Sequence, residues 1–440
     1  MLTVAEFGRI YRADRDESTD DGNLLLRPKH FDAMLRLLEA DDDDLPDYGP
    51  VFSYLRPRGQ EQLRVQNYVG VIRLADGIQI EVLPKISKRL ETGTARNLLI
   101  KMLIELADSP FFEGTASDLD AHNMPIFELL MRCFLEKVTV IVRKGIARDY
   151  VPREDNLVFL RGKLNVAEHI RRNSYNSSRV YCNYDEFDLD RPINRLIKGA
   201  LQIVNRLTRE PINQQLCREL LFWFERVPAT RNAGQDFNRV RRDRFIQHYQ
   251  SAIPLCRLIL ENLNPLTRQG ENHIVSMLFP MESVFEAYVA AKLQQQFRDW
   301  KVSSQIGGES LVEEHLGRQM FALRPDLMLS QGHFNIVADT KWKLIDQSNR
   351  SDKYGISQAD VYQLFGYARK YLQNQNLREV LLIYPACETF SKPLEPFWFQ
   401  PASDVLHIVP YDLEEDVLLL PINSLLGNCQ MDAPQGLTVS

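Results

Sequence analysis

The sequence is short of the features that identify several common classes of protein. Its six cysteines are scattered and none forms a C-x-x-C pair, so nothing indicates a zinc ribbon or a thioredoxin-like redox site. No apolar run approaches the ~20 residues that a membrane-spanning helix needs. The charged N-terminus lacks the apolar segment of a signal peptide. No G-x-x-x-x-G-K-[ST] segment is present, which excludes a P-loop nucleotide hydrolase. We therefore expect a cytoplasmic protein with reduced thiols and no membrane association.

The chain also lacks an excess of positive charge. Of its 440 residues, 53 are Lys or Arg and 59 are Asp or Glu, so the formal net charge is −6. Affinity for nucleic acid comes mainly from cations that neutralise phosphates. A DNA-binding role therefore needs a local basic surface or a partner that holds the DNA. Five arginines lie within residues 231–244 and acidic clusters precede residue 45, although such runs are most often solvated faces.

The patterns that are present predict a β-rich N-terminal region and a helical middle region, within the two to three domains expected for this length. Residues 67–74 and 78–82 flank the turn Ala75-Asp76-Gly77 as strands of a hairpin do, and helical spacing follows at 95–110 and 124–137. Residues 150–265 are expected to be mostly helical, with helices at 193–207, 213–226 and 236–263 and a kink at Pro254.

The C-terminal region predicts a different architecture. Its elements follow the order helix, strand, strand, helix, strand, at residues 283–300, 321–329, 334–344, 358–372 and 380–384. The last of these is wholly apolar, as in a strand buried on both faces. Residues 405–409 are a candidate for one more strand. This order predicts an α/β core, with a mixed sheet flanked by helices.

Two short motifs in the C-terminal region bring carboxylates together. Strand side chains alternate between faces, so Asp339 and Lys341 project to the same side. The hairpin places Asp326, which follows Pro325, on the neighbouring strand. Two carboxylates held side by side suit a hard cation, and Mg²⁺ is commonly held by one or two carboxylates plus phosphate oxygens. Lys341 is expected to position or activate a water, or to stabilise negative charge on a phosphate.

These motifs predict metal-assisted phosphodiester hydrolysis. A lone D-x-K triplet is more often a surface ion pair, but the mostly apolar residues 334–338 indicate an internal strand, where an unpaired charge is costly. Glu286, in the helix before the hairpin, is a candidate third metal ligand. Gln363, in the helix after it, is a candidate to orient water or a phosphate. For both residues, a plain solvent-facing role is the alternative.

The sequence resembles the McrC family of nuclease subunits. The resemblance lies in Pro325-Asp326 and in residues 284–289, 336–343 and 360–368, and it continues at 67–72, 80–86, 160–164 and 190–198. It covers most of residues 65–390. It implies a restriction-endonuclease-like core of the PD-(D/E)xK kind with Asp326, Asp339 and Lys341 as catalytic residues. The expected cofactor is Mg²⁺, for which Mn²⁺ is expected to substitute.

The resemblance also implies partners. In the family, a domain outside the nuclease core docks onto a hexameric AAA+ GTPase, McrB, and stimulates it, while McrB recognises methylated or otherwise modified double-stranded DNA. We expect residues 1–150 to be the docking region, 151–270 the helical middle region and 275–440 the nuclease domain. The expected function is the endonuclease subunit of a McrBC-like restriction and phage-defence complex. Two alternatives stay open, namely a regulatory adaptor of the ring with weak or no nuclease activity and a stand-alone repair-type nuclease.

Overall fold

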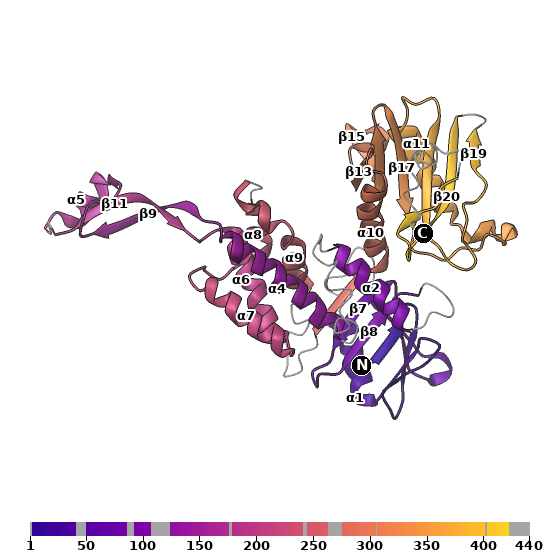
Figure 1. The fold of residues 1–440 in the computed structure, drawn as a ribbon, viewed down its shortest axis with the longest axis horizontal. Coiled ribbons are helices and arrows are strands. Elements are labelled where there is room, and N and C mark those ends of the chain that lie inside the picture. The colour runs from indigo at the N-terminus through magenta and orange to yellow at the C-terminus, as the bar shows by residue number, and fades with distance from the viewer. Residues whose placement is uncertain are drawn as a thin grey trace, which may run out of the picture. The chain divides into compact units, whose positions relative to one another are not determined.

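The computed structural model describes residues 2–40, 50–85, 92–106, 124–175, 178–240, 244–262, 275–304, 306–400 and 403–421. The chain forms two compact units (Figure 1). We call them the sheet unit (Met1–Leu106, Leu266–Ile274 and Leu278–Ser440) and the helical unit (Ala107–Pro265 and Val275–Met277). The unit boundaries therefore differ from the expected boundaries at residues 150 and 270, because residues 1–106 belong to the same unit as the C-terminal region.

The N-terminal half of the sheet unit contains two sheets. The predicted hairpin is present as β7 (Tyr68–Arg73) and β8 (Gln79–Leu83), and β1 (Leu2–Ala5) pairs with β8 in parallel. A five-stranded sheet follows the order β3-β4-β2-β6-β5, with α1 (Pro28–Ala40) packed on it and apolar side chains such as Leu24, Phe31 and Leu63 fully buried. Its strands are β2 (Arg9–Arg12), β3 (Glu17–Ser18), β4 (Leu24–Leu26), β5 (Phe52–Leu55) and β6 (Gln62–Val65).

The C-terminal half of the sheet unit is built on a seven-stranded mixed sheet, as the sequence predicts. Six strands follow the order β13-β16-β17-β18-β20-β19, and β21 pairs with β20. β17, β18 and β20 are parallel, and the other pairs are antiparallel. The strands are β13 (Lys301–Ser304), β16 (Leu327–Gln331), β17 (Phe334–Thr340), β18 (Arg378–Pro385), β19 (Phe397–Gln400), β20 (Asp404–Asp412) and β21 (Val417–Leu418). β18 is buried over nearly all its length.

Helices and a hairpin accompany this sheet. α10 (Met281–Gln296) contacts β13, β17 and β21, and α11 (Gln358–Tyr371) contacts β17 and β18. β14 (Glu309–His315) and β15 (Arg318–Leu323) form a separate hairpin that contacts α11. α2 (Thr92–Leu106) packs against α10, where Glu105 pairs with Lys292 at 3.0 Å and Lys101 pairs with Asp416 at 2.9 Å. This packing joins the two halves of the sheet unit.

The helical unit has a core of packed helices. These are α4 (Ile126–Lys144), α6 (Pro192–Leu207), α7 (Pro211–Trp223), α8 (Ala233–Arg239) and α9 (Ile253–Asn262). α6 and α7 each begin with a proline, which has the backbone angle of a first helical turn and lacks an N–H that would stay unbonded there. The buried carboxylate of Glu128 ties α4 to α7, since it accepts hydrogen bonds from Thr208 Oγ1 (2.6 Å) and Asn213 Nδ2 (3.0 Å).

An arm extends from these helices (Figure 1). It consists of β9 (Asp149–Leu157) paired with β11 (Val180–Asp188), and its far end carries β10 (Lys163–Leu164) and α5 (Val166–Asn173). The far end exposes a cluster of apolar side chains, namely Val158, Phe159, Leu160, Leu164, Val166, Ile170 and Tyr175. The expectation that residues 150–265 are mostly helical was wrong for this part of the chain.

Several expected bounds also need correction. The strand expected at 334–344 ends at Thr340, and the strand expected at 321–329 is interrupted between Leu323 and Leu327. The helix expected at 236–263 is split into α8, a 3-10 helix (Arg244–Tyr249) and α9, and Pro254 lies in the first turn of α9, where a proline is tolerated. Among the described residues, no helix is long and apolar enough to cross a bilayer.

Candidate active site

The two predicted motifs meet at one end of the C-terminal sheet. Asp339 pairs with Leu382 of β18, and the N–H of Lys341 donates to the carbonyl of Ile383 (2.9 Å), so Lys341 continues the ladder just beyond β17. Asp326 precedes β16, and its Oδ2 accepts hydrogen bonds from Thr340 N (2.7 Å) and Thr340 Oγ1 (2.8 Å). Lys341 Nζ lies 2.6 Å from Asp339 Oδ2. The structure therefore brings Asp326, Asp339 and Lys341 together.

The alternation of β17 decides which face these groups occupy. Val337 packs with side chains of α11, including Leu364 and Tyr367. Asp339 is two residues further along the strand and projects to the same face. Asp339 thus lies on the face of the sheet that α11 covers, and only 1% of its surface is exposed.

Burial dominates the electrostatics of this group of charges. Burial, and next the charge of Asp326, raise the pKa of Asp339 to about 7, while Lys341 acts in the opposite direction. For Lys341, burial opposes the charge, but Asp339, Asp326 and Asp360 together outweigh it and raise the pKa of the ammonium group above its ordinary value. Lys341 therefore stays protonated, and a positive charge nearby stabilises the ionised form of Asp339.

The carboxylate of Asp339 is only partly paired. Its Oδ2 lies 2.6 Å from Lys341 Nζ, whereas its Oδ1 has no hydrogen-bond partner among the described residues. Buried carboxylate oxygens without partners are costly, and a cation beside them removes the cost. Asp326 and Asp339 therefore fit a hard divalent cation.

The ligand set favours one kind of metal. Within the described part of the chain, no group of three or more His, Cys, Asp or Glu side chains is arranged to hold an ion. A zinc site normally needs three or four such ligands. Mg²⁺ keeps several waters and is often held by one or two carboxylates together with substrate phosphates. The pair of carboxylates therefore fits Mg²⁺ better than Zn²⁺.

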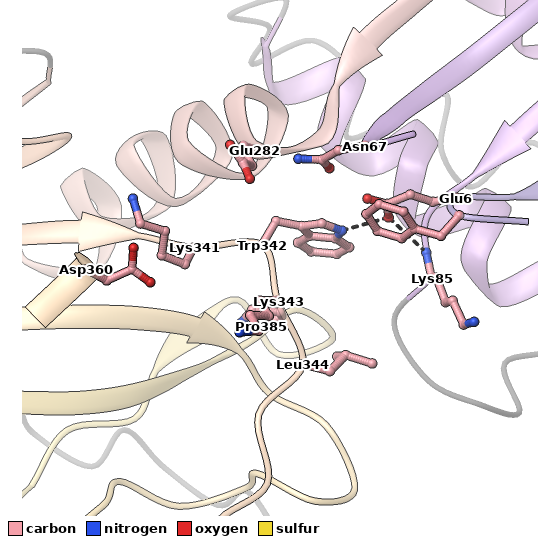
Figure 2. A pocket seen from close by; sticks show the side chains of 11 residues that line it. Glu6, Asn67, Lys85, Glu282, Lys341, Trp342, Lys343, Leu344, Asp360 and Pro385 are labelled. Carbon is pink, nitrogen blue, oxygen red and sulfur yellow. Dashed lines mark hydrogen bonds between the residues drawn. The ribbon is translucent and has the colours of Figure 1, made fainter. Parts of the chain in front are cut away.

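A cavity of about 500 Å³ opens beside Lys341. Figure 2 shows Glu282 of α10 and Asp360 of α11 on either side of Lys341, with Trp342 between Lys341 and Glu6. The remaining lining comes from both halves of the sheet unit and comprises Glu6, Phe7, Asn67, Lys85, Lys343, Leu344 and Pro385. A cavity of this size next to the carboxylates can admit part of a substrate.

The two weaker candidates lie on the flanking helices. Gln363 Nε2 donates to Tyr367 Oη, which in turn donates to the carbonyl of Arg324 (2.9 Å). Gln363 is thus linked to the segment that carries Asp326. Glu286 is half-buried on α10, one turn after Glu282. Its role as a metal ligand stays a prediction.

The sequence reasoning missed three residues near this site. Asp360 and Glu282 line the cavity with Lys341, and Tyr384 of β18 is fully buried with a hydroxyl that has no hydrogen-bond partner within the described ranges. Asp339 and Asp360 both act, after burial, to raise the pKa of Tyr384, which places its hydroxyl close to the carboxylates. Two signals in the sequence could have indicated these residues. Glu282 and Asp360 are acidic residues in the first turns of their helices, and Tyr384 directly follows the apolar residues 380–383.

Comparisons with known sequences identify the family. The model of the family described as "McrBC 5-methylcytosine restriction system component" matches residues 63–385, which include both motifs. The chain is similar to the type IV methyl-directed restriction enzyme EcoKMcrBC of Escherichia coli (strain K12). The two are 22% identical over 272 residues, which cover 58% of this chain and 75% of the relative.

Solved structures share the fold. One is the half-complex from a tetradecameric assembly of Thermococcus gammatolerans McrB AAA+ hexamers with bound McrC, with a TM-score of 0.61 and 17% identity over 93% of this chain and 94% of that chain. Another is the Thermococcus gammatolerans McrBC complex, with a TM-score of 0.50 and 20% identity over 67% of this chain and 88% of that chain. At these identities the likeness concerns the fold alone.

Proposed function

This chain belongs to the family of McrBC 5-methylcytosine restriction system components, and we propose that it is the Mg²⁺-dependent DNA endonuclease of such a system, with a PD-(D/E)xK core. The observation that carries the proposal is the buried Asp339, which lies beside Asp326 and Lys341 and whose Oδ1 has no hydrogen-bond partner among the described residues. A site built only for stability has no use for such a carboxylate, because an apolar residue of similar size costs less to bury.

The roles of the residues follow from their charges. Asp326 and Asp339 would hold the cation, and Glu286 would reach it through a water molecule. When bound, Mg²⁺ neutralises phosphate charge and makes a water molecule more acidic. Lys341 keeps its proton, so it donates hydrogen bonds to a phosphate oxygen and stabilises negative charge that develops there. Gln363 holds Tyr367, which fixes the backbone before Asp326.

The second part of the proposal is a partner. We propose that the chain acts with a hexameric McrB-like AAA+ GTPase that recognises modified double-stranded DNA, in phage defence. A related solved assembly holds McrC bound to McrB AAA+ hexamers. The exposed apolar end of the arm suits such a contact, because large exposed apolar patches mark interaction surfaces. The docking surface that we propose is therefore the far end of the arm, residues 158–175, in place of residues 1–150.

The test uses the full chain with and without its AAA+ partner. Plasmids with and without 5-methylcytosine are incubated with GTP and Mg²⁺, Mn²⁺, Ca²⁺ or EDTA. We expect cutting of modified DNA with Mg²⁺ or Mn²⁺ and the partner, and no cutting with Ca²⁺ or EDTA. Cutting in excess EDTA would contradict the metal site. Stimulated GTP hydrolysis without any cutting would indicate the adaptor, and cutting without the partner would indicate a stand-alone nuclease.

A further inference from the structure

A buried carboxylate from the far N-terminus reaches the candidate active site. Glu6 follows β1, and its N–H donates to the carbonyl of Leu83 at the end of β8 (2.8 Å). Its side chain is fully buried. Oε2 accepts hydrogen bonds from Trp342 Nε1 (2.8 Å) and from Lys85 N (3.3 Å), as the dashed lines in Figure 2 show. Glu6 therefore joins the N-terminal sheet to the residue next to Lys341.

Trp342 lies where the catalytic strand loses its regular structure. β17 ends at Thr340, and the N–H of Lys341 still donates to the carbonyl of Ile383. Beyond it, Trp342 is buried, with its ring centroid 5.3 Å from that of Phe285 on α10. Packing against the Phe285 ring restricts the tilt of the Trp342 indole. The hydrogen bond from Nε1 to Glu6 fixes the direction in which the edge of the indole points. The backbone of Trp342 in turn limits where the side chain of Lys341 can point.

A second hydrogen bond links the sheet that contains β1, β7 and β8 to the cavity, on the side of α10. The N–H of Met281 donates to the carbonyl of Asn67 (3.1 Å), just before β7. This bond anchors the first turn of α10, which carries the cavity residue Glu282. Both Lys341 and Glu282 are therefore held next to contacts from the N-terminal half of the sheet unit.

Burying the Glu6 carboxylate between two elements costs free energy. Its Oε1 has no hydrogen-bond partner in the part of the chain that the structure describes, and burial raises the pKa of the carboxyl to about 7, although the bond from Trp342 acts in the opposite direction. Apolar side chains would join the same surfaces at a lower cost in free energy. A carboxylate adds what apolar packing lacks, which is one short directional bond to a single N–H.

We propose that Glu6 is a positioning residue for DNA cleavage, which holds Trp342 and, through it, Lys341 in the geometry that the reaction needs. The inference rests on the proposed nuclease function. It makes cutting depend on the N-terminal sheet, whose own residues hold no part of the carboxylate pair.

Three variants test the inference in the full chain with its partner. Glu6→Ala removes the acceptor, and Trp342→Phe removes the donor while it keeps a ring against Phe285. A displacement of about 1 Å near reacting groups can cost ~100-fold in rate. We expect each variant to lower kcat for cleavage by about 10- to 100-fold, with KM for DNA and stimulation of GTP hydrolysis unchanged. Glu6→Gln keeps an acceptor oxygen and should cleave within about threefold of the wild type.

Matched controls separate positioning from packing. Trp300 is buried in the same unit, but its Nε1 has no hydrogen-bond partner among the residues described, so Trp300→Phe should cleave at the wild-type rate. The double variant Glu6→Ala/Trp342→Phe should lose no more than the worse single variant, because both remove one interaction. In an ¹⁵N spectrum, Glu6→Ala should shift the indole resonance that disappears in Trp342→Phe.

The outcomes are distinct. If the wild type cuts and both Glu6→Ala and Trp342→Phe cut equally well, the inference is wrong and the proposed function stands. Multiplicative losses in the double variant, or an indole resonance that Glu6→Ala leaves in place, would also overturn it. Equal losses of cleavage and GTPase stimulation would show a structural role. If the wild type does not cut modified DNA under any condition, the proposed function fails and the inference falls with it.

Discussion

Neutralising Asp339 should stabilise the metal-free protein and abolish cutting at the same time. Burial, together with Asp326, raises the pKa of this carboxyl from 3.8 to about 7. That difference corresponds to about 4 kcal/mol of preference for the protonated form. The amide that Asp339→Asn introduces resembles the protonated carboxyl at every pH, so the substitution removes this cost above pH 7. The attraction of Lys341 is already included in that pKa, but the buried amide brings N–H donors that need partners, so we expect a net rise of about 1–3 kcal/mol.

The pH dependence of the difference is specific. The folded-state pKa is raised, so the stability that the protonated carboxyl supports is complete below about pH 4 and is lost as the pH rises through about 7. The gap in Tm between Asp339→Asn and the wild type should therefore open between pH 4 and 7 and stay level above it. At about 2–4 °C per kcal/mol, the gap should reach about 2–12 °C at pH 8. Thermal melts in EDTA measure it.

Divalent cations should reverse the order. A cation that binds only the folded wild type raises its Tm in proportion to the logarithm of the free concentration. Ca²⁺ is expected to bind without supporting cleavage, so it should raise the Tm of the wild type and leave that of Asp339→Asn unchanged. A lower Tm for Asp339→Asn in EDTA across pH 5–8, or any retained cutting by this variant, would refute the reasoning.

Three further predictions concern the site, the sheet and the arm. Lys341→Ala should lower the cleavage rate by ~100-fold or more, because it removes a cation from the developing charge, while GTPase stimulation persists. Asp404→Asn should lower the free energy of unfolding by about 3 kcal/mol, because Arg369 (2.8 Å) and Arg378 (2.7 Å) lose a fully buried partner. The sign is opposite to that expected for Asp339→Asn, and chemical denaturation measures the change. Replacing residues 158–179 with Asn-Gly would join the paired residues Leu157 and Val180 by a hairpin turn. This variant should lose GTPase stimulation and keep the Ca²⁺-dependent rise in Tm. Unchanged stimulation would exclude the arm as the docking surface.

Local periodicity predicted the elements that carry the site. The hairpin β7-β8, the helices α10 and α11 and the buried strand β18 all have strong patterns over five residues or more. The arm was missed because Val180–Asp188 exposes part of each face and therefore lacks an apolar alternation. The five-stranded N-terminal sheet was missed because its strands are two to four residues long, which is shorter than any reliable repeat.

The same limit applies to the site. Asp339 and Lys341 share a strand face by simple alternation, and a hairpin brings Asp326 beside them, so the sequence predicts their proximity. Glu6 lies 336 residues from Trp342 along the chain, and only tertiary packing brings them together. No repeat or spacing in one sequence signals such a contact. The same holds for the packing of α2 on α10, which unites regions that the sequence separates.

The order of these elements along the chain has a consequence during synthesis. Domains fold as they leave the ribosome, at ~5–20 residues per second. The N-terminal sheets and the helical unit with its arm are complete before Asp326 is made, whereas β17 also needs β18 and β20, which are translated later. Trp342 is therefore synthesised tens of seconds after Glu6, and the hydrogen bond between them can form only then. An unfinished chain can present its arm but not an assembled carboxylate pair, so a truncated translation product would compete for the partner without cutting DNA.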